Sequence, residues 1–163
     1  MARPTTSLCE REQHGFVRVA AVSPELRLGD PAANSRITVE ALRRVAGEGC
    51  RVAVFPELGL TGYSCGDLFH LTVLQQAALE ALSTVAEASA GTGCLAVVGL
   101  PLAVGGRLYN VAAVAGDGRV LGIVPKTFLP TASEFYEARW FAAAPMLTER
   151  SILLNGLEVP IGT

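Results

Sequence analysis

The chain has 163 residues and a mass of 17.0 kDa; 50% of its residues are hydrophobic, only 17% are charged, and its formal net charge is −2. A chain of this size buries about 70% of its unfolded surface, so it can form a core without disulfides or metals. The composition excludes a disordered chain, a collagen and a small disulfide scaffold. The 17 Gly and 9 Pro predict short elements joined by tight turns, which is typical of α/β and α+β domains.

The charge pattern argues against nucleic-acid and membrane partners. The 13 Lys and Arg residues are scattered along the chain, so no cluster would neutralise a run of phosphates. The longest apolar run, residues 95–104, contains a glycine and a proline and has about half of the ~20 residues that a membrane-spanning helix needs. We therefore expect neither nucleic acid nor a membrane as a partner.

The N-terminal segment and the cysteines indicate a cytoplasmic protein. Residues 1–15 are polar and lack an apolar signal-peptide core, so we interpret them as a flexible leader. The four cysteines, Cys9, Cys50, Cys65 and Cys94, form no C-x-x-C pair and share no ligand spacing with the two histidines. The sequence therefore predicts neither a metal site nor a structural disulfide.

The first half of the chain predicts two units of a strand followed by a helix. Residues 16–22 alternate and indicate a strand, and Asp30 before a proline predicts the start of a helix that ends at the glycines 47 and 49. Residues 51–55 are a continuous apolar run, typical of a strand buried on both faces. A glycine-rich loop then leads to Asp67, which we expect to cap a second helix ending near residue 91.

The second half predicts strands joined by tight turns. Apolar runs cover residues 94–104, 108–115 and 119–125, with Gly-Gly and Gly-Asp-Gly turns between them. Residues 127–144 are polar and aromatic without a clear period, and an Asn-Gly turn at 155–156 predicts a final hairpin. The order β-α-β-α-β-β-β predicts a mixed α/β sheet with helices on one face.

Two ionisable residues each follow a predicted strand and a proline, namely Glu57 and Lys126. Both are expected at sheet edges and half buried. Burial raises the pKa of a carboxyl group and lowers that of an ammonium, whereas proximity of the two restores both charges. The pair is therefore either a tuned base beside a fixed cation or a structural ion pair.

The sequences around these residues resemble those of a known family. The segment with Glu57 reads FPELGLTGY and the segment with Lys126 reads VPKTFLP, which resemble the Glu and Lys motifs of nitrilase-like carbon-nitrogen hydrolases. The strings YSCGDLF and LPTASEFYEARWF, one after each motif, are similar to the glutaminase domain of glutamine-dependent NAD synthetases. The motifs lie 69 residues apart (126 minus 57), and the resemblance identifies residues 16–163 as a partial domain of this family.

The resemblance implies a four-layer αββα sandwich and an amide-hydrolysing mechanism. A cysteine thiolate attacks the side-chain carbonyl of glutamine, ammonia leaves, and water then releases glutamate from the thioester. Glu57 is expected to act as the general base and Lys126 to stabilise the oxyanion.

The resemblance also implies partners for the domain. In the family, ammonia passes to a C-terminal synthetase domain that uses ATP and Mg to amidate nicotinic acid adenine dinucleotide. We expect glutamine, that synthetase domain and further copies of the chain as partners. The glutaminase domain itself is expected to need no cofactor and no metal, and no residue of the synthetase domain is expected in this chain.

The family's nucleophile follows the Lys motif, and no cysteine follows Lys126 here. Cys65 lies eight residues past Glu57, where the family often carries a cysteine that is not the nucleophile. We therefore expect the chain to be a fragment that ends before the nucleophile and that has no glutaminase activity alone.

Three further residues match substrate-pocket positions of the family: Tyr63, Phe135 and Glu137. Glu137 is expected to bind the α-amino group of the substrate and to help position Lys126; the alternative is a surface carboxylate on a loop. Ala132 stands where many relatives carry an aromatic ring.

Two other functions remain open from the sequence. The same residues would suit a free-standing amidase or carbamoylase that acts on another small amide. A non-catalytic module that keeps the fold without a nucleophile is the other alternative.

Overall fold

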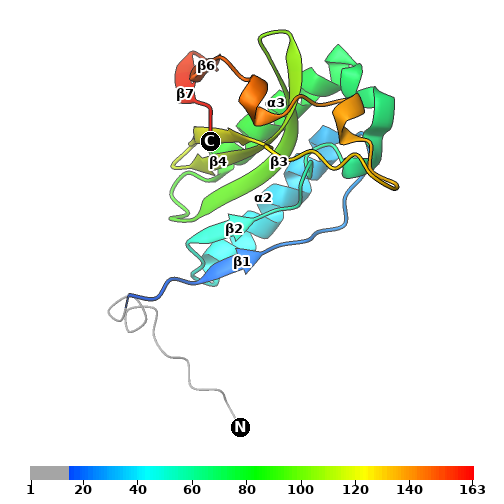
Figure 1. Cartoon of the computed structure of the whole chain (residues 1–163). Coiled ribbons are helices and arrows are strands. Elements are labelled where there is room, and N and C mark those ends of the chain that lie inside the picture. Colours follow the sequence, from blue (N-terminus) through cyan, green and yellow to red (C-terminus); the bar gives the residue numbers. More distant parts are fainter. Residues whose placement is uncertain (1–14) are drawn as a thin grey trace.

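The computed structural model describes residues 15–163, so the expected leader lies outside it apart from Gly15. A mixed sheet of five strands in the order β1-β2-β3-β4-β5 forms the centre, and two helices cover one of its faces (Figure 1). A separate two-stranded hairpin, β6-β7, lies beside β5. The predicted mixed sheet with helices on one face is thus confirmed.

The first three strands are parallel and are connected through the two helices. Their bounds are β1 (Val19–Ala21), β2 (Val52–Val54) and β3 (Leu95–Val104). The first two are shorter than the predicted runs, because only three residues of each pair with a neighbour.

The helix α2 (Pro31–Gly47) begins as the sequence predicts. The side chain of Asp30 accepts a hydrogen bond from the backbone N–H of Ala33 at 2.9 Å, which satisfies a donor that the first turn would otherwise leave free. The helix α3 (Thr72–Ala88) begins after Leu71, which contributes no side-chain cap. The prediction that Asp67 caps this helix is therefore wrong.

The second half of the chain folds through the tight turns that its glycines predict. The strand β4 (Arg107–Gly116) pairs antiparallel with β3 and with β5 (Arg119–Pro125). The final hairpin consists of β6 (Ser151–Leu154) and β7 (Leu157–Pro160), and both of its turn residues have positive φ, as an Asn-Gly turn requires. Short 3₁₀ segments complete the described part of the chain: η1 (Tyr63–His70), which contains a kink, η2 (Glu137–Arg139) and η3 (Ala144–Met146).

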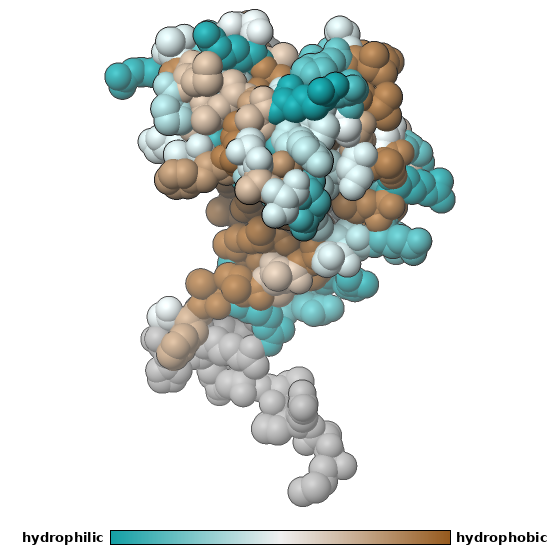
Figure 2. Space-filling view, turned by 45° about the vertical axis from the view of Figure 1, so that its right-hand side comes forward, coloured by the Kyte–Doolittle hydropathy of each residue, from teal (hydrophilic) through white to brown (hydrophobic). Residues whose placement is uncertain are grey.

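The sheet has one covered and one open face. Ala53 pairs with Ala20 and Ala96, and Ala53 and Ala96 are fully buried in the core shared with the helices. Val54, which points to the opposite face, is 45% exposed, so the prediction that this strand is buried on both faces is wrong. Figure 2 shows mainly hydrophobic surface in the lower part of the molecule, where β1 and β2 lie in Figure 1.

The chain leaving β2 turns directly over β3 at Gly99. A Cβ atom at Gly99 would overlap the backbone of Leu58 and would lie 2.8 Å from the carbonyl oxygen of Pro56. The N–H of Leu60 donates to the carbonyl oxygen of Gly99 at 3.0 Å. This position therefore requires glycine, and the close approach fixes the loop that carries Glu57.

We predict that Gly99→Ala destabilises the chain by about 1–3 kcal/mol, because the added methyl group meets backbone that cannot rotate away. Urea unfolding monitored by circular dichroism measures the change. The matched control is Gly47→Ala in α2, where a Cβ atom meets nothing within 4 Å. The control is expected to be neutral or stabilising by up to about 1 kcal/mol. Equal losses in both variants would contradict the close packing at Gly99.

Candidate active site

The two ionisable residues that the sequence singles out meet at one edge of the sheet. Glu57 follows β2 and Lys126 follows β5, and these strands run in the same direction although β3 and β4 lie between them. The loop after β2 crosses β3 and places the Glu57 carboxylate beside the Lys126 ammonium group. Lys126 Nζ lies 2.6 Å from Glu57 Oε1 and 2.8 Å from Glu137 Oε1.

The backbone of Lys126 is held on both sides. Its N–H donates to the carbonyl oxygen of Asn110 in β4 at 2.8 Å, and its carbonyl oxygen accepts from the N–H of Ala144 at 3.0 Å. The Lys126 side chain is 28% exposed and that of Glu57 is 43% exposed, so both are half buried as predicted.

Glu137 lies in η2 with a side chain that is only 2% exposed. Its Oε1 accepts hydrogen bonds from the Tyr63 hydroxyl at 2.7 Å and from Lys126 Nζ at 2.8 Å. A buried carboxylate is costly unless it is paired and hydrogen-bonded, and these donors meet that requirement. The alternative interpretation of Glu137 as a surface carboxylate is therefore wrong.

The sequence interpretation missed Asn110, which lies at the centre of the cluster. This residue is buried on β4, and its Nδ2 donates to Glu57 Oε1 and, at 3.5 Å, to Glu137 Oε2. The signal in the sequence was a lone amide in an otherwise apolar alternating strand. We refer to Glu57, Tyr63, Asn110, Lys126 and Glu137 as the carboxylate–lysine cluster.

Opposite charges decide the protonation of the cluster. Burial by itself lowers the pKa of Lys126. The hydrogen bonds and charges of Glu137 and Glu57 raise it by more than burial lowers it, so the pKa lies above the ordinary 10.5. Burial, followed by the hydrogen bond to Glu137 and the charges of both carboxylates, raises the pKa of Tyr63 well above the ordinary 10.0. Lys126 is therefore a cation and Tyr63 a neutral donor at neutral pH.

A second group of contacts holds the loop that carries Glu137. Arg139 donates through Nε and Nη2 to both oxygens of Asp67, at 2.8 and 3.0 Å, and Trp140 Nε1 donates to Asp67 Oδ1 at 2.9 Å. The Phe69 ring packs against the rings of Trp140 and Phe141. The hydrogen bonds from Arg139 and Trp140 keep the pKa of Asp67 well below its ordinary value. Asp67 thus joins η1 to η2 instead of capping a helix.

The side chain of Phe135 has no polar atom that could form a hydrogen bond with the cluster. Phe135 lies on the same loop, two residues before Glu137, and the residue is 39% exposed. The structure thus joins four of the five predicted site residues through hydrogen bonds to one another, and Phe135 lies beside them on the chain.

A cleft of about 660 Å³ opens on the uncovered face of the sheet beside the cluster. Its walls are mostly apolar side chains from β2, β3, β4 and β5, and its polar members are Glu57, Asn110, Lys126 and Thr127. An apolar cleft with a few convergent polar groups is typical of a small-molecule site.

The described cysteines lie outside this cluster. Cys65 is buried in η1, its Sγ donates to the carbonyl oxygen of Thr61 at 3.2 Å, and burial raises the pKa of its thiol. Cys50 and Cys94 are buried one or two residues before β2 and β3, at the ends opposite to Glu57. Cys9 lies outside the described residues.

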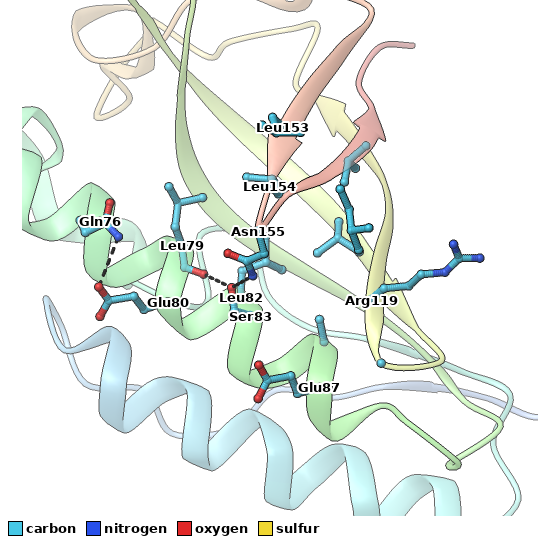
Figure 3. Close-up of a pocket in the computed structure, with 15 residues that line it drawn as sticks. Gln76, Leu79, Glu80, Leu82, Ser83, Glu87, Arg119, Leu153, Leu154 and Asn155 are labelled. Carbon is cyan, nitrogen blue, oxygen red and sulfur yellow. Dashed lines mark hydrogen bonds between the residues drawn. The ribbon is translucent and has the colours of Figure 1, made fainter.

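Another cavity, of about 390 Å³, lies between α3 and the β6-β7 hairpin (Figure 3). Asn155 Nδ2 donates to Ser83 Oγ at 2.8 Å, and Gln76 Nε2 donates to Glu80 Oε1 at 3.3 Å. Its polar groups are thus largely paired with one another, and the contact between Asn155 and Ser83 ties the hairpin turn to the helix.

Two features are absent from residues 15–163. No helix in this range is long and apolar enough to cross a membrane. No three His, Cys, Asp or Glu side chains of the same range lie close enough together to hold a metal ion.

Comparison with known proteins identifies a family and two kinds of relative. Residues 18–157 match the family model described as carbon-nitrogen hydrolase. The chain is 45% identical over 152 residues to a glutamine-dependent NAD(+) synthetase of Mycobacterium tuberculosis, and 41% identical over 148 residues to that of Mycobacterium leprae. These matches cover 93% and 91% of the chain but only 22% of each relative.

Solved structures show the same fold. A glutamine-dependent NAD(+) synthetase from Cytophaga hutchinsonii superposes with a TM-score of 0.83 at 27% identity, over 90% of this chain and 25% of that one. An amidase from Nesterenkonia sp. superposes with a TM-score of 0.66 at 23% identity, over 85% of this chain and 51% of that one. The described residues thus have the fold of this family, and they supply one helical layer and one sheet.

We predict that Tyr63 ionises late and that its ionisation destabilises the fold. Because its native pKa is raised, its contribution to stability is complete below pH 10 and is lost as the pH rises above that value. The phenolate absorbance of the native chain minus that of Tyr63→Phe measures this ionisation. Tyr136→Phe, at an exposed position, is the matched reference. Ionisation of Tyr63 at its ordinary pH, near 10, would contradict the hydrogen bond between Tyr63 and Glu137.

Proposed function

Because the chain belongs to the carbon-nitrogen hydrolase family, we propose that it forms part of the glutaminase domain of a glutamine-dependent NAD synthetase. The observation that carries this proposal is the ammonium group of Lys126, which binds Glu57 and Glu137 together at the edge of an apolar cleft. A base and a fixed cation beside one cleft are the groups that hydrolysis of an amide requires.

In the proposed reaction Glu57 removes the proton of a cysteine thiol, and the sulfur forms a bond to the carbonyl carbon of the glutamine side chain. The electron pair of the carbonyl moves to oxygen, where the ammonium group of Lys126 stabilises it. As the C–N bond breaks, Glu57 returns the proton to nitrogen and ammonia leaves. Water then attacks the thioester with Glu57 as base, glutamate leaves, and the sulfur regains its proton.

The thiol in this proposal comes from none of the described cysteines, because Cys50, Cys65 and Cys94 are buried and no hydrogen bond joins any of them to the cluster. A place for it exists along the outer edge of β5. Ile161 pairs in parallel with Ile123, and the N–H of Gly162 donates to the carbonyl oxygen of Ile123 at 3.1 Å. A segment continuing in this direction would run along β5 towards Lys126, so we propose that it brings the nucleophile. Residues 1–163 alone are then inactive as a glutaminase.

Glutamine recognition is assigned to the buried side of the cluster. Two carboxylates and one ammonium group leave a net negative charge, which favours the cationic α-amino group of an amino acid. Glu137 supplies this charge, Tyr63 orients it through the hydrogen bond at 2.7 Å, and Phe135 is proposed as a wall of the pocket. Ala132 is exposed on the same loop, so the pocket lacks a ring at that position.

The remaining parts of the proposed activity lie outside these residues. Ammonia would pass to a synthetase domain that uses ATP and Mg to amidate nicotinic acid adenine dinucleotide to NAD. The relatives, of which this chain spans less than a quarter, carry that name as whole proteins. We propose that the complete enzyme is a cytoplasmic homo-oligomer and that the glutaminase chemistry itself uses no cofactor.

We predict that Glu57→Gln and Lys126→Ala each lower ammonia release from glutamine by about 100-fold or more in the full-length gene product. The first removes the base and the second removes the oxyanion donor. A coupled assay of free ammonia measures the rate. Glu40→Gln, on the exposed side of α2, is the matched carboxylate control and is expected to retain the rate.

Three results would contradict the proposal. Unchanged rates in both variants would remove the assigned roles. Activity on other small amides but not on glutamine would indicate a free-standing amidase. A folded wild-type product that hydrolyses no amide would indicate a non-catalytic module.

A further inference from the structure

Asn110 contacts each charged member of the carboxylate–lysine cluster. Its carbonyl oxygen accepts from the N–H of Lys126 at 2.8 Å, and its Nδ2 donates to Glu57 and to Glu137. The residue is buried in the middle of the sheet, where β3 places Pro101 opposite to it. Because β4 is paired on both sides, the amide is held by the most regular part of the fold.

The contacts distinguish the two oxygens of Glu57. Both Asn110 Nδ2 and Lys126 Nζ donate to Oε1. No side chain among residues 15–163 donates to Oε2, and Glu57 lines the cleft. An oxygen that accepts two hydrogen bonds, one of them from a cation, is a poor proton acceptor, whereas the other oxygen remains available.

The chemistry of the amide suits this position better than that of other side chains of its size. The Nδ2 group has two N–H donors, one for each carboxylate, and carries no charge. An aspartate would add a third negative charge, and a leucine would leave both carboxylates with one donor fewer. A neutral side chain with two donors therefore fits two carboxylates that already share one cation.

We propose that Asn110 is a positioning residue of the amide-hydrolysing site, which fixes Glu57 and Glu137 relative to Lys126 and makes Oε2 of Glu57 the basic oxygen. This inference rests on the proposed function. In this proposal the neutral side chain of Asn110 determines which oxygen of Glu57 removes the proton of the thiol.

The hydrogen bonds of Asn110 stabilise the ionised forms of its partners. The titratable groups that contact it are Glu57 after β2, Lys126 after β5 and Glu137 in η2, and Tyr63 in η1 reaches this group through its hydrogen bond to Glu137. Removal of the donors is therefore expected to cost less stability where one of the carboxylate partners is already absent.

The experiment compares Asn110→Ala with Asn34→Ala in the full-length gene product. Asn34 is also a buried asparagine, but its side chain bonds the backbone of Arg27 and Leu60 and touches no carboxylate. Asn110→Ala is expected to lower kcat/KM for glutamine by about 10- to 100-fold. It is also expected to move the acid side of the pH–rate profile to higher pH. Asn34→Ala is expected to lower stability without moving that profile.

A second measurement needs no activity. The fall in Tm caused by Asn110→Ala is expected to be smaller in a Glu57→Ala background than in the wild type, because one of the contacts that it removes is already absent, whereas Asn34→Ala should lower Tm equally in both backgrounds. If the alanine variant does not fold, the uncharged pair Asn110→Leu and Asn34→Leu, which keeps more of the side-chain volume, gives the same comparison. A wild-type product that releases no ammonia would overturn the proposed function, and the Tm comparison would still decide the role of Asn110. An active wild type with an unchanged profile in Asn110→Ala would overturn this inference alone.

Discussion

The contact of one ammonium group with two carboxylates is the interaction on which the rest of the site depends. Glu137 is buried, and it can remain ionised there because Lys126 and Tyr63 donate to it. The same ammonium holds Glu57, so it joins the loop after β2 to the loop after β5. Loss of Lys126 would leave two carboxylates facing each other with only neutral donors.

The fold supplies this contact by placing irregular loops on a rigid sheet. Gly99 allows the loop with Glu57 to lie directly on β3, and the N–H of Lys126 is bonded to β4. Asp67 holds the segment that carries Glu137 through hydrogen bonds from Arg139 and Trp140, and the Phe69 ring packs against the Trp140 ring. Loops held by a rigid scaffold are where binding and catalytic residues are often found, and the carboxylate–lysine cluster is built in this way.

Local signals in the sequence predicted most elements, and long-range contacts account for the errors. The cap at Asp30 and the Asn-Gly hairpin turn depend on neighbouring residues and were predicted correctly. Asp67 was expected to cap a helix, but its partner Arg139 lies 72 residues away. Asn110 was missed because its carboxylate partners come from other segments of the chain. Glu57 and Lys126 were singled out as a pair because each follows an apolar strand and a proline, which places both at sheet edges.

The central claim is that the carboxylate–lysine cluster activates a thiol that the described cysteines do not supply. Covalent labelling of the full-length gene product with a thiol-reactive glutamine analogue, followed by peptide mapping, tests it most directly. The account predicts a single adduct on a cysteine that follows Thr163, with labelling that slows in Lys126→Ala. An adduct on Cys65, or no adduct on any cysteine of the folded protein, would contradict it.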